Sequence, residues 1–294
     1  MIGAIAALTT ACCWAVAARL YRQLGASFSP VTLNFWKGLI SLAILLPLSP
    51  ALPFSPAWIS ASPLSTSQLM MLLLSGAIGI GLGDTCFFLA LNRIGDRLSL
   101  LVAETLAPLL TAIFAIIWLM ELLSWQQWLG IACILLAVDM VLRLQRRQQP
   151  QQLWSGYSFA ALAALCQAIG AVISRDVFLH SSIDVASASS WRLLGGMAII
   201  VPMLLFSRTR LLPRPHHQLR PWLILLAATL IGTTAAIYLQ MLAFSHSKAA
   251  IVQTLLATSV ILSLLLARAL GDTLPKGSLL WTLTALLGVG LLLG

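Results

Sequence analysis

Charged residues are scarce in this chain: of its 294 residues, only 9% are Asp, Glu, Lys or Arg, whereas 60% are hydrophobic. Soluble domains carry about a quarter charged residues. A soluble core of this size has no room for so much apolar surface, so the composition predicts an all-α integral membrane protein. The net charge is +9, but no domain-sized polar surface exists to carry a basic face. The lipid bilayer is therefore an expected partner, and nucleic acid is not.

Motifs for disulfide or metal chemistry are also missing. The five cysteines lie in apolar runs, without a CxxC pair or a nearby histidine cluster. We interpret them as small apolar residues of the interior. His216 and His217 are adjacent in a polar loop, which is poor spacing for one metal-binding helix face. The sequence predicts neither a metal site nor a cofactor.

Long apolar runs fill most of the chain. Runs of about 20 residues, long enough to span a bilayer as a helix, lie at 2–21, 30–49, 68–91, 98–120, 125–142, 155–174, 184–206, 222–244, 248–270 and 277–293. The first run lacks the basic segment that precedes a signal peptide core, so we expect it to be a helix of the mature protein. The polar stretch "RLQRRQQPQQ" then divides the ten spans into two sets of five.

The two halves of the sequence resemble each other. "NFWKGLISLAILLP" (34–47) aligns with "SSWRLLGGMAIIVP" (189–202), and the acid after the fourth span aligns with the acid after the ninth. The matched pairs are Trp36 with Trp191, Lys37 with Arg192, and Glu121 with Asp272. We predict repeats at 1–148 and 149–294. Because five is odd, the second repeat is inverted, as in secondary transporters whose substrate site lies between the halves.

Basic residues divide unequally between the two faces of the predicted bundle. Thirteen lie in or beside the loops of one face, the basic-rich face, and two, Arg175 and Lys248, belong to the other, the basic-poor face. The positive-inside rule makes the basic-rich face cytoplasmic. Both termini are then expected outside the cytoplasm, in a bacterial inner (plasma) membrane.

The ordered set of motifs resembles the drug/metabolite transporter superfamily, of the EamA type. The resemblance rests on "ACCWAVAAR" in the first span, "FWKG" and "SWRL" early in the second and seventh, and "GIGLGDTCFFLAL" in the third. Pro108 in the fourth span and the acid after the fourth and ninth spans also fit. The resemblance implies a ten-helix metabolite carrier, often an exporter, with a central cavity. Members are usually drawn with cytoplasmic termini, contrary to the charge distribution here, and the first span lacks the glutamate of the small multidrug carriers.

Three ionisable residues are expected at one depth. Counting from the basic-rich face at about 1.5 Å per residue, Lys37 and Asp84 lie about seven residues deep and Glu104 about six. Such groups face a protein interior or a water-filled cavity. We predict a Lys37–Asp84–Glu104 cluster, which is either a structural ion network or a gating or proton-coupling site. Two carboxylates beside one ammonium leave one acid unpaired, which suits proton release and uptake.

Arg192 lies about eight residues from the basic-poor face, and no carboxylate is expected at its level. A guanidinium in a polar pocket is suited to clamping a carboxylate or phosphate. Alternatively, Arg192 bonds backbone carbonyls or reaches the membrane interface. The other candidates for the cavity lining are Tyr238, Gln240, Gln253, Gln167 and Trp14.

The leading hypothesis is a secondary transporter, an exporter of small metabolites such as amino acids or other organic anions and zwitterions, working by alternating access. The alternatives are a membrane-embedded enzyme and a non-transporting scaffold. An enzyme is disfavoured because the loops carry no DxxD, HxxxH or nucleophile–base pair. Two complete repeats make a monomer sufficient, and a dimer is compatible with the same sequence.

Overall fold

The first repeat forms five helical spans in the computed structural model of the chain, which describes residues 1–25, 27–49, 65–144, 154–207, 211–212, 219–271 and 277–294. Its first two helices are α1 (Ile2–Leu24) and α2 (Pro30–Leu45). α3 (Thr66–Gly76), the π-helical segment η2 (Ala77–Gly83) and α4 (Asp84–Leu119) follow without a break and supply the third and fourth spans. α5 (Trp125–Leu144) is the fifth.

The second repeat follows the same order. α6 (Trp154–His180) and α7 (Val185–Ser207) are its first two spans. Its third span is continuous through α8 (Arg220–Thr229), the π-helical segment η3 (Leu230–Ala235) and α9 (Ala236–His246). α10 (Ala249–Ala257) and α11 (Ser259–Ala269) form the next, and α12 (Ser278–Leu293) is the last. Within the described residues, eight helical segments reach spanning length, and α2 and α12 are shorter apolar helices, so the predicted ten-helix, two-repeat architecture is confirmed.

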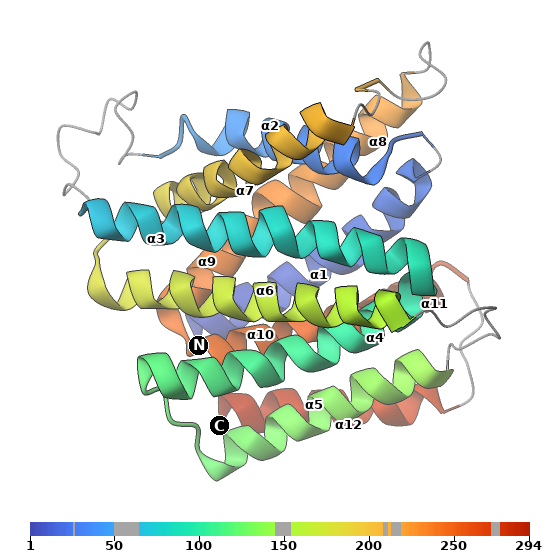
Figure 1. The fold of residues 1–294 in the computed structure, drawn as a ribbon. Helices are drawn as coiled ribbons and strands as arrows, with labels where there is room; N and C mark the ends of the chain where they lie inside the picture. The colour runs from blue at the N-terminus through green and yellow to red at the C-terminus, as the bar shows by residue number, and fades with distance from the viewer. Residues whose placement is uncertain (26, 50–64, 145–153, 208–210, 213–218, 272–276) are drawn as a thin grey trace.

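The connection between the third and fourth spans differs from the expected loop. We expected a break between residues 91 and 98, but the backbone there stays helical within α4 while the chain reverses direction (Figure 1). Polar residues in the sequence show where the chain leaves the apolar layer of the membrane. They do not show whether the helix ends there. A helical connection keeps the backbone N–H and C=O groups bonded within the chain.

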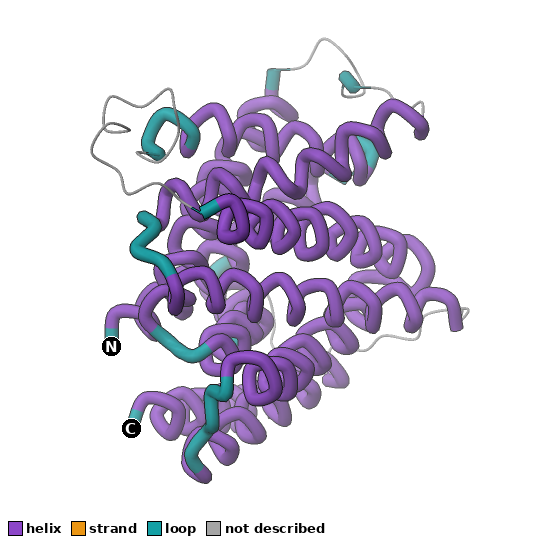
Figure 2. Tube along the Cα trace, turned by 60° about the vertical axis from the view of Figure 1, so that its left-hand side comes forward, coloured by secondary structure: helices purple, strands orange, loops and turns teal. Residues whose placement is uncertain are grey.

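Both termini lie at the same end of the bundle, near the connection between α4 and α5 (Figures 1 and 2). This arrangement follows from the even total of ten spans, because each span crosses the bundle once. Large apolar side chains remain exposed around the bundle, such as Leu205 at 73% and Phe206 at 87%. These surfaces suit contact with lipid, and the chain is an integral membrane protein.

The backbones of the two repeats approach each other closely where α7 packs against α3. A Cβ on Gly76 would meet the carbonyl oxygen of Arg192, and a Cβ on Gly195 would meet the carbonyl oxygen of Leu73. Small residues allow helices in membranes to approach closely. The glycines of "GIGLG" lie in η2, where the helix continues without a break, and Gly81 packs against Ile199 of α7.

The five cysteines are all free thiols. Cys86 and Cys166 are buried, whereas Cys12 is exposed on the outside of α1, so the expectation of interior positions does not hold for Cys12. Cysteine is apolar enough to be tolerated on a surface that faces lipid.

Candidate functional site

Lys37 and Asp84 form an ion pair inside the bundle. The Lys37 Nζ donates to Asp84 Oδ2 at 2.8 Å, and the two side chains are 16% and 22% exposed. Asp84 is the first residue of α4, directly after η2, and Phe88 one turn later places its ring centroid 5.8 Å from the ammonium. The pair therefore joins α2 to the start of α4 within the first repeat.

Glu104 is not part of this pair. It lies on α4, between the buried residues Ser99 and Ala107, and among the described contacts it has no ion pair or hydrogen bond with Lys37 or Asp84. The expected three-member cluster is thus reduced to two members. Residue counting gives the depth of a side chain in a span, but it does not give the direction in which the side chain points around the helix axis.

Arg192 is one of the most deeply buried large side chains, with 2% of its surface exposed. Its Nη1 lies 3.9 Å from the thioether sulfur of Met241 on α9, and its Nε has no hydrogen-bond partner among the described residues. Its Nη2 lies between two glycines, because a Cβ on Gly79 would be 3.2 Å away and one on Gly170 would be 3.5 Å away. The guanidinium is thus held between η2, α6 and α9.

Asp84 also acts electrostatically on Arg192, although no ion pair joins the two residues. Asp84 belongs to the first repeat, so comparing matched positions within the second repeat alone could not find it. The expectation that no carboxylate lies at the level of Arg192 itself stays a prediction. Lys37, Asp84 and Arg192 form one central group, called here the central charges.

The remaining candidates are placed less uniformly. Gln240 and Gln253 are both buried at 4% exposure, and the Gln253 Oε1 accepts no hydrogen bond. Tyr238 is 39% exposed, and Trp14 packs against the main apolar core. Gln167 is half-buried on α6. In the described part of the chain, none of these side chains is hydrogen-bonded to Arg192.

Two hydroxyl contacts that sequence reasoning missed join the first repeat to η3. The Tyr21 hydroxyl bonds to Thr233 Oγ1 at 2.8 Å, and the buried Ser41 hydroxyl bonds to Thr234 Oγ1 at 2.9 Å. Ser41 lies one helical turn beyond Lys37 on α2. The adjacent threonines of "IGTTA" were the only sequence signal, and nothing in the sequence indicated which helices they would contact.

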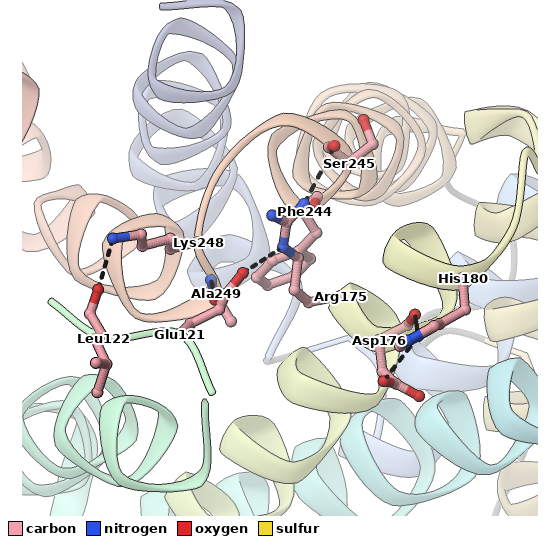
Figure 3. A network of polar contacts seen from close by, with 9 residues as sticks. All are labelled: Glu121, Leu122, Arg175, Asp176, His180, Phe244, Ser245, Lys248 and Ala249. Atoms are coloured by element: carbon pink, nitrogen blue, oxygen red, sulfur yellow. Dashed lines mark hydrogen bonds and ion pairs between the residues drawn. The ribbon is translucent and has the colours of Figure 1, made fainter. Parts of the chain in front are cut away.

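A second polar network lies at the basic-poor face (Figure 3). Arg175, near the end of α6, donates from Nε to Glu121 Oε1 at 2.8 Å and from Nη1 to the carbonyl oxygens of Phe244 and Ser245 at 2.8 and 3.2 Å. The Glu121 Oε2 accepts the N–H of Ala249 at 2.9 Å. The arginine thus caps the last carbonyls of α9, and the carboxylate caps the first N–H of α10, each with the charge that the helix dipole favours.

Lys248 extends this network toward the same connecting segment. Its Nζ donates to the carbonyl oxygen of Leu122 at 2.6 Å and lies 3.4 Å from Gln127 Oε1. Both basic residues of the basic-poor face therefore bind the segment that joins α4 to α5. We name Glu121, Arg175, Lys248 and Ala249 the cap network. The sequence singled out Glu121 through its match with Asp272, which lies outside the described residues, but it gave no partner for it.

Ten helical spans in two equivalent sets, with charged groups between them inside the membrane, define an integral membrane protein of transporter architecture. The chain belongs to the EamA-like transporter family, which it matches over residues 1–143 and 154–294. A solved structure described only as a crystal structure of a protein is similar over 99% of this chain and 96% of its own, with a TM-score of 0.79 and 19% identity. That similarity concerns the fold alone. No curated protein matches the sequence.

Proposed function

We propose that the protein is a secondary transporter that exports small metabolites, such as amino acids or other organic anions and zwitterions, by alternating access. The observation that carries the proposal is the position of the central charges. Lys37 and Asp84 belong to the first repeat and Arg192 to the second. Asp84 and Arg192 lie in helices of membrane-spanning length, and Lys37 lies in the shorter apolar helix α2. Ionisable groups at such depth are characteristic of substrate and ion pathways.

The cap network supports alternating access on geometric grounds. It joins the α4–α5 segment of the first repeat to α6, α9 and α10 of the second. Contacts of this kind close one end of a carrier and must break when that end opens. We assign the cap network to closure of the basic-poor face.

The charge distribution favours a cytoplasmic basic-rich face and extracytoplasmic termini. We place the protein in a bacterial inner membrane on the same basis. One chain contains both repeats, so a monomer is sufficient for transport. We retain Lys37, Asp84 and Glu104 as candidates for gating or proton coupling. Tyr238, Gln240, Gln253, Gln167 and Trp14 remain candidates for the substrate path.

The test is uptake into proteoliposomes that contain the purified full chain. Labelled amino acids and small organic anions are offered one at a time, with and without a pH gradient across the membrane. A carrier accumulates at least one of these solutes above protein-free vesicles, and it exchanges that solute against an unlabelled internal pool. If no solute of the panel enters or exchanges, the carrier hypothesis is wrong. If uptake is identical with and without the gradient, proton coupling is excluded.

A further inference from the structure

We propose that Arg192 is the binding group for a carboxylate of the transported solute. The inference rests on the proposed function, because it takes the ligand to be the solute that is carried. It goes further in naming one residue, the atoms that bind, and the chemical group that is recognised.

The first observation is the unmet hydrogen-bonding capacity of the guanidinium. Arginine carries five N–H donors in a fixed fork, yet the Nε of Arg192 has no acceptor and Nη1 reaches only the Met241 sulfur at 3.9 Å. The side chain is 98% shielded from solvent, with 2% of its surface exposed. A buried charged group without hydrogen bonds is costly. The guanidinium therefore lacks an acceptor at Nε and a close oxygen acceptor at Nη1, and a carboxylate supplies two oxygens in the geometry of the fork.

The structural explanations for a buried arginine do not account for this one. An arginine that supports the fold bonds backbone carbonyls, as Arg175 does with Phe244 and Ser245. The described contacts of Arg192 include no carbonyl acceptor. An arginine that reaches the membrane interface exposes its head group, whereas Arg192 is buried.

The second observation is the shape of the surroundings. Gly79 of η2 and Gly170 of α6 flank Nη2, and a Cβ at either position would approach it to 3.2 or 3.5 Å. A side chain at either position would crowd Nη2, so glycine at both positions leaves room for the guanidinium itself between η2 and α6.

The balance of charge selects a carboxylate over a phosphate. Asp84 is engaged by Lys37 at 2.8 Å, so that pair is neutral as a unit, and Arg192 adds one positive charge. A carboxylate contributes one negative charge and balances it. A phosphate monoester carries about −1.5 to −2 at neutral pH, which leaves an excess of negative charge inside the span. The expected ligand is thus a small solute with a single carboxylate at the bound end, such as an amino acid or a monocarboxylate.

Binding is tested on the full chain in detergent by ligand-dependent shifts of its thermal unfolding temperature. The probes are L-amino acids and monocarboxylates, each paired with its own carboxamide, and inorganic phosphate. At least one carboxylate is expected to stabilise the protein while its amide, of nearly equal size, does not. Stabilisation by the amide as strong as by the acid, by phosphate alone, or by no probe overturns the proposal.

Variants locate the site. Arg192→Gln is expected to weaken carboxylate binding about ten- to hundredfold, and Arg192→Lys, which keeps the charge but loses the fork, by about tenfold. Gly79→Ala narrows the space beside Nη2 and is expected to weaken binding while Arg192 is retained, so it serves if the arginine variants do not fold. Gly290→Ala, which adds a Cβ with nothing within 4 Å of it, is the matched control for Gly79→Ala and is expected to bind within about twofold of wild type. Equal affinity in wild type and all three test variants refutes the site.

Proteoliposome uptake of the same solutes separates the two proposals. Carboxylate binding that depends on Arg192 without any transport leaves the site intact and contradicts the carrier function. Transport that is unaffected by Arg192→Gln, with no carboxylate preference, leaves the carrier function intact and contradicts the site.

Discussion

The substitution Glu121→Gln tests whether the cap network holds the basic-poor face closed. The substitution keeps the size of the side chain and an amide oxygen that can still accept the Ala249 N–H, but it removes the negative charge opposite Arg175. Both side chains of the pair are shielded, at 9% exposure for Glu121 and 12% for Arg175. If the network closes the basic-poor face, the closed state alone loses this interaction, and the open state becomes more populated.

The magnitude follows from the contacts. Breaking a fully buried ion pair by removing one partner costs about 3–5 kcal/mol, because the other charge is left without compensation. Arg175 keeps two carbonyl acceptors, on Phe244 and Ser245, so the penalty here is smaller, about 2 kcal/mol. Since about 1.4 kcal/mol corresponds to a factor of ten, the ratio of open to closed molecules is expected to rise about 30-fold.

The assay is labelling of a cysteine introduced at Ala250, which is 1% exposed and follows the capped residue Ala249. All five native cysteines are free thiols, so their replacement by alanine breaks no disulfide. A membrane-impermeant maleimide is added from the basic-poor face, and the labelling rate reports the open population. Asp176→Asn is the matched control, because Asp176 pairs with His180 on the same end of α6 and takes no part in the cap network (Figure 3).

Glu121→Gln is expected to accelerate labelling about 30-fold by the same arithmetic, and Asp176→Asn is expected to leave it unchanged. Equal rates in Glu121→Gln and wild type mean that the network does not hold the face closed. A comparable acceleration in both variants means that the loss of any carboxylate at this end loosens the protein, which would also refute the reasoning.

Two further predictions concern stability. Gly195→Ala adds a Cβ that meets the carbonyl oxygen of Leu73 and is expected to lower the free energy of unfolding by about 2 kcal/mol; Gly290→Ala, with nothing within 4 Å of its Cβ, is the control in thermal unfolding and is expected to be neutral. Asp84→Asn removes the partner of Lys37 and is expected to cost about 3 kcal/mol. The double variant with Lys37→Gln is expected to recover most of that loss, and additive effects of the two changes would show that the pair is not coupled.

The sequence predicted the architecture because the bilayer imposes it. The chain has ten apolar runs of spanning length, five in each half, and the cations of the two halves match. These features predict two inverted repeats, and the helices begin and end within a few residues of the predicted runs. The contact between Lys37 and Asp84 also followed from equal depth. Depth did not tell whether Glu104 would point toward the same pair, since rotation about the helix axis depends on packing with neighbouring helices.

Contacts that involve backbone groups were beyond the reach of sequence reasoning. Arg175 and Glu121 are 54 positions apart. Arg175 binds carbonyl groups at the end of α9 and Glu121 binds the N–H at the start of α10, and no side-chain pattern in the sequence identifies such backbone groups as partners. The sequence singled out both residues, one as a rare cation of its face and the other as a repeated acid. The sequence could not show that these two residues form an ion pair, because the order of the spans along the chain does not tell which helix ends lie side by side in the fold.

The π-helical segments locate the centre of the fold more clearly than any motif. η2 and η3 lie at matching places in the two repeats, in the third span of each. π-helical segments are rare and often lie at functional positions. Their occurrence in both repeats indicates that this backbone irregularity is a property of the repeat itself. The polar partners have diverged around this shared backbone: η2 leads into Asp84 and flanks Arg192, whereas η3 carries hydroxyls that bind Tyr21 and Ser41. Charged side chains therefore lie beside η2, whereas neutral hydrogen bonds between hydroxyl groups lie beside η3. A symmetric scaffold that carries so asymmetric a set of polar groups can hold the charged end of a solute at η2 while η3 contributes contacts without charge.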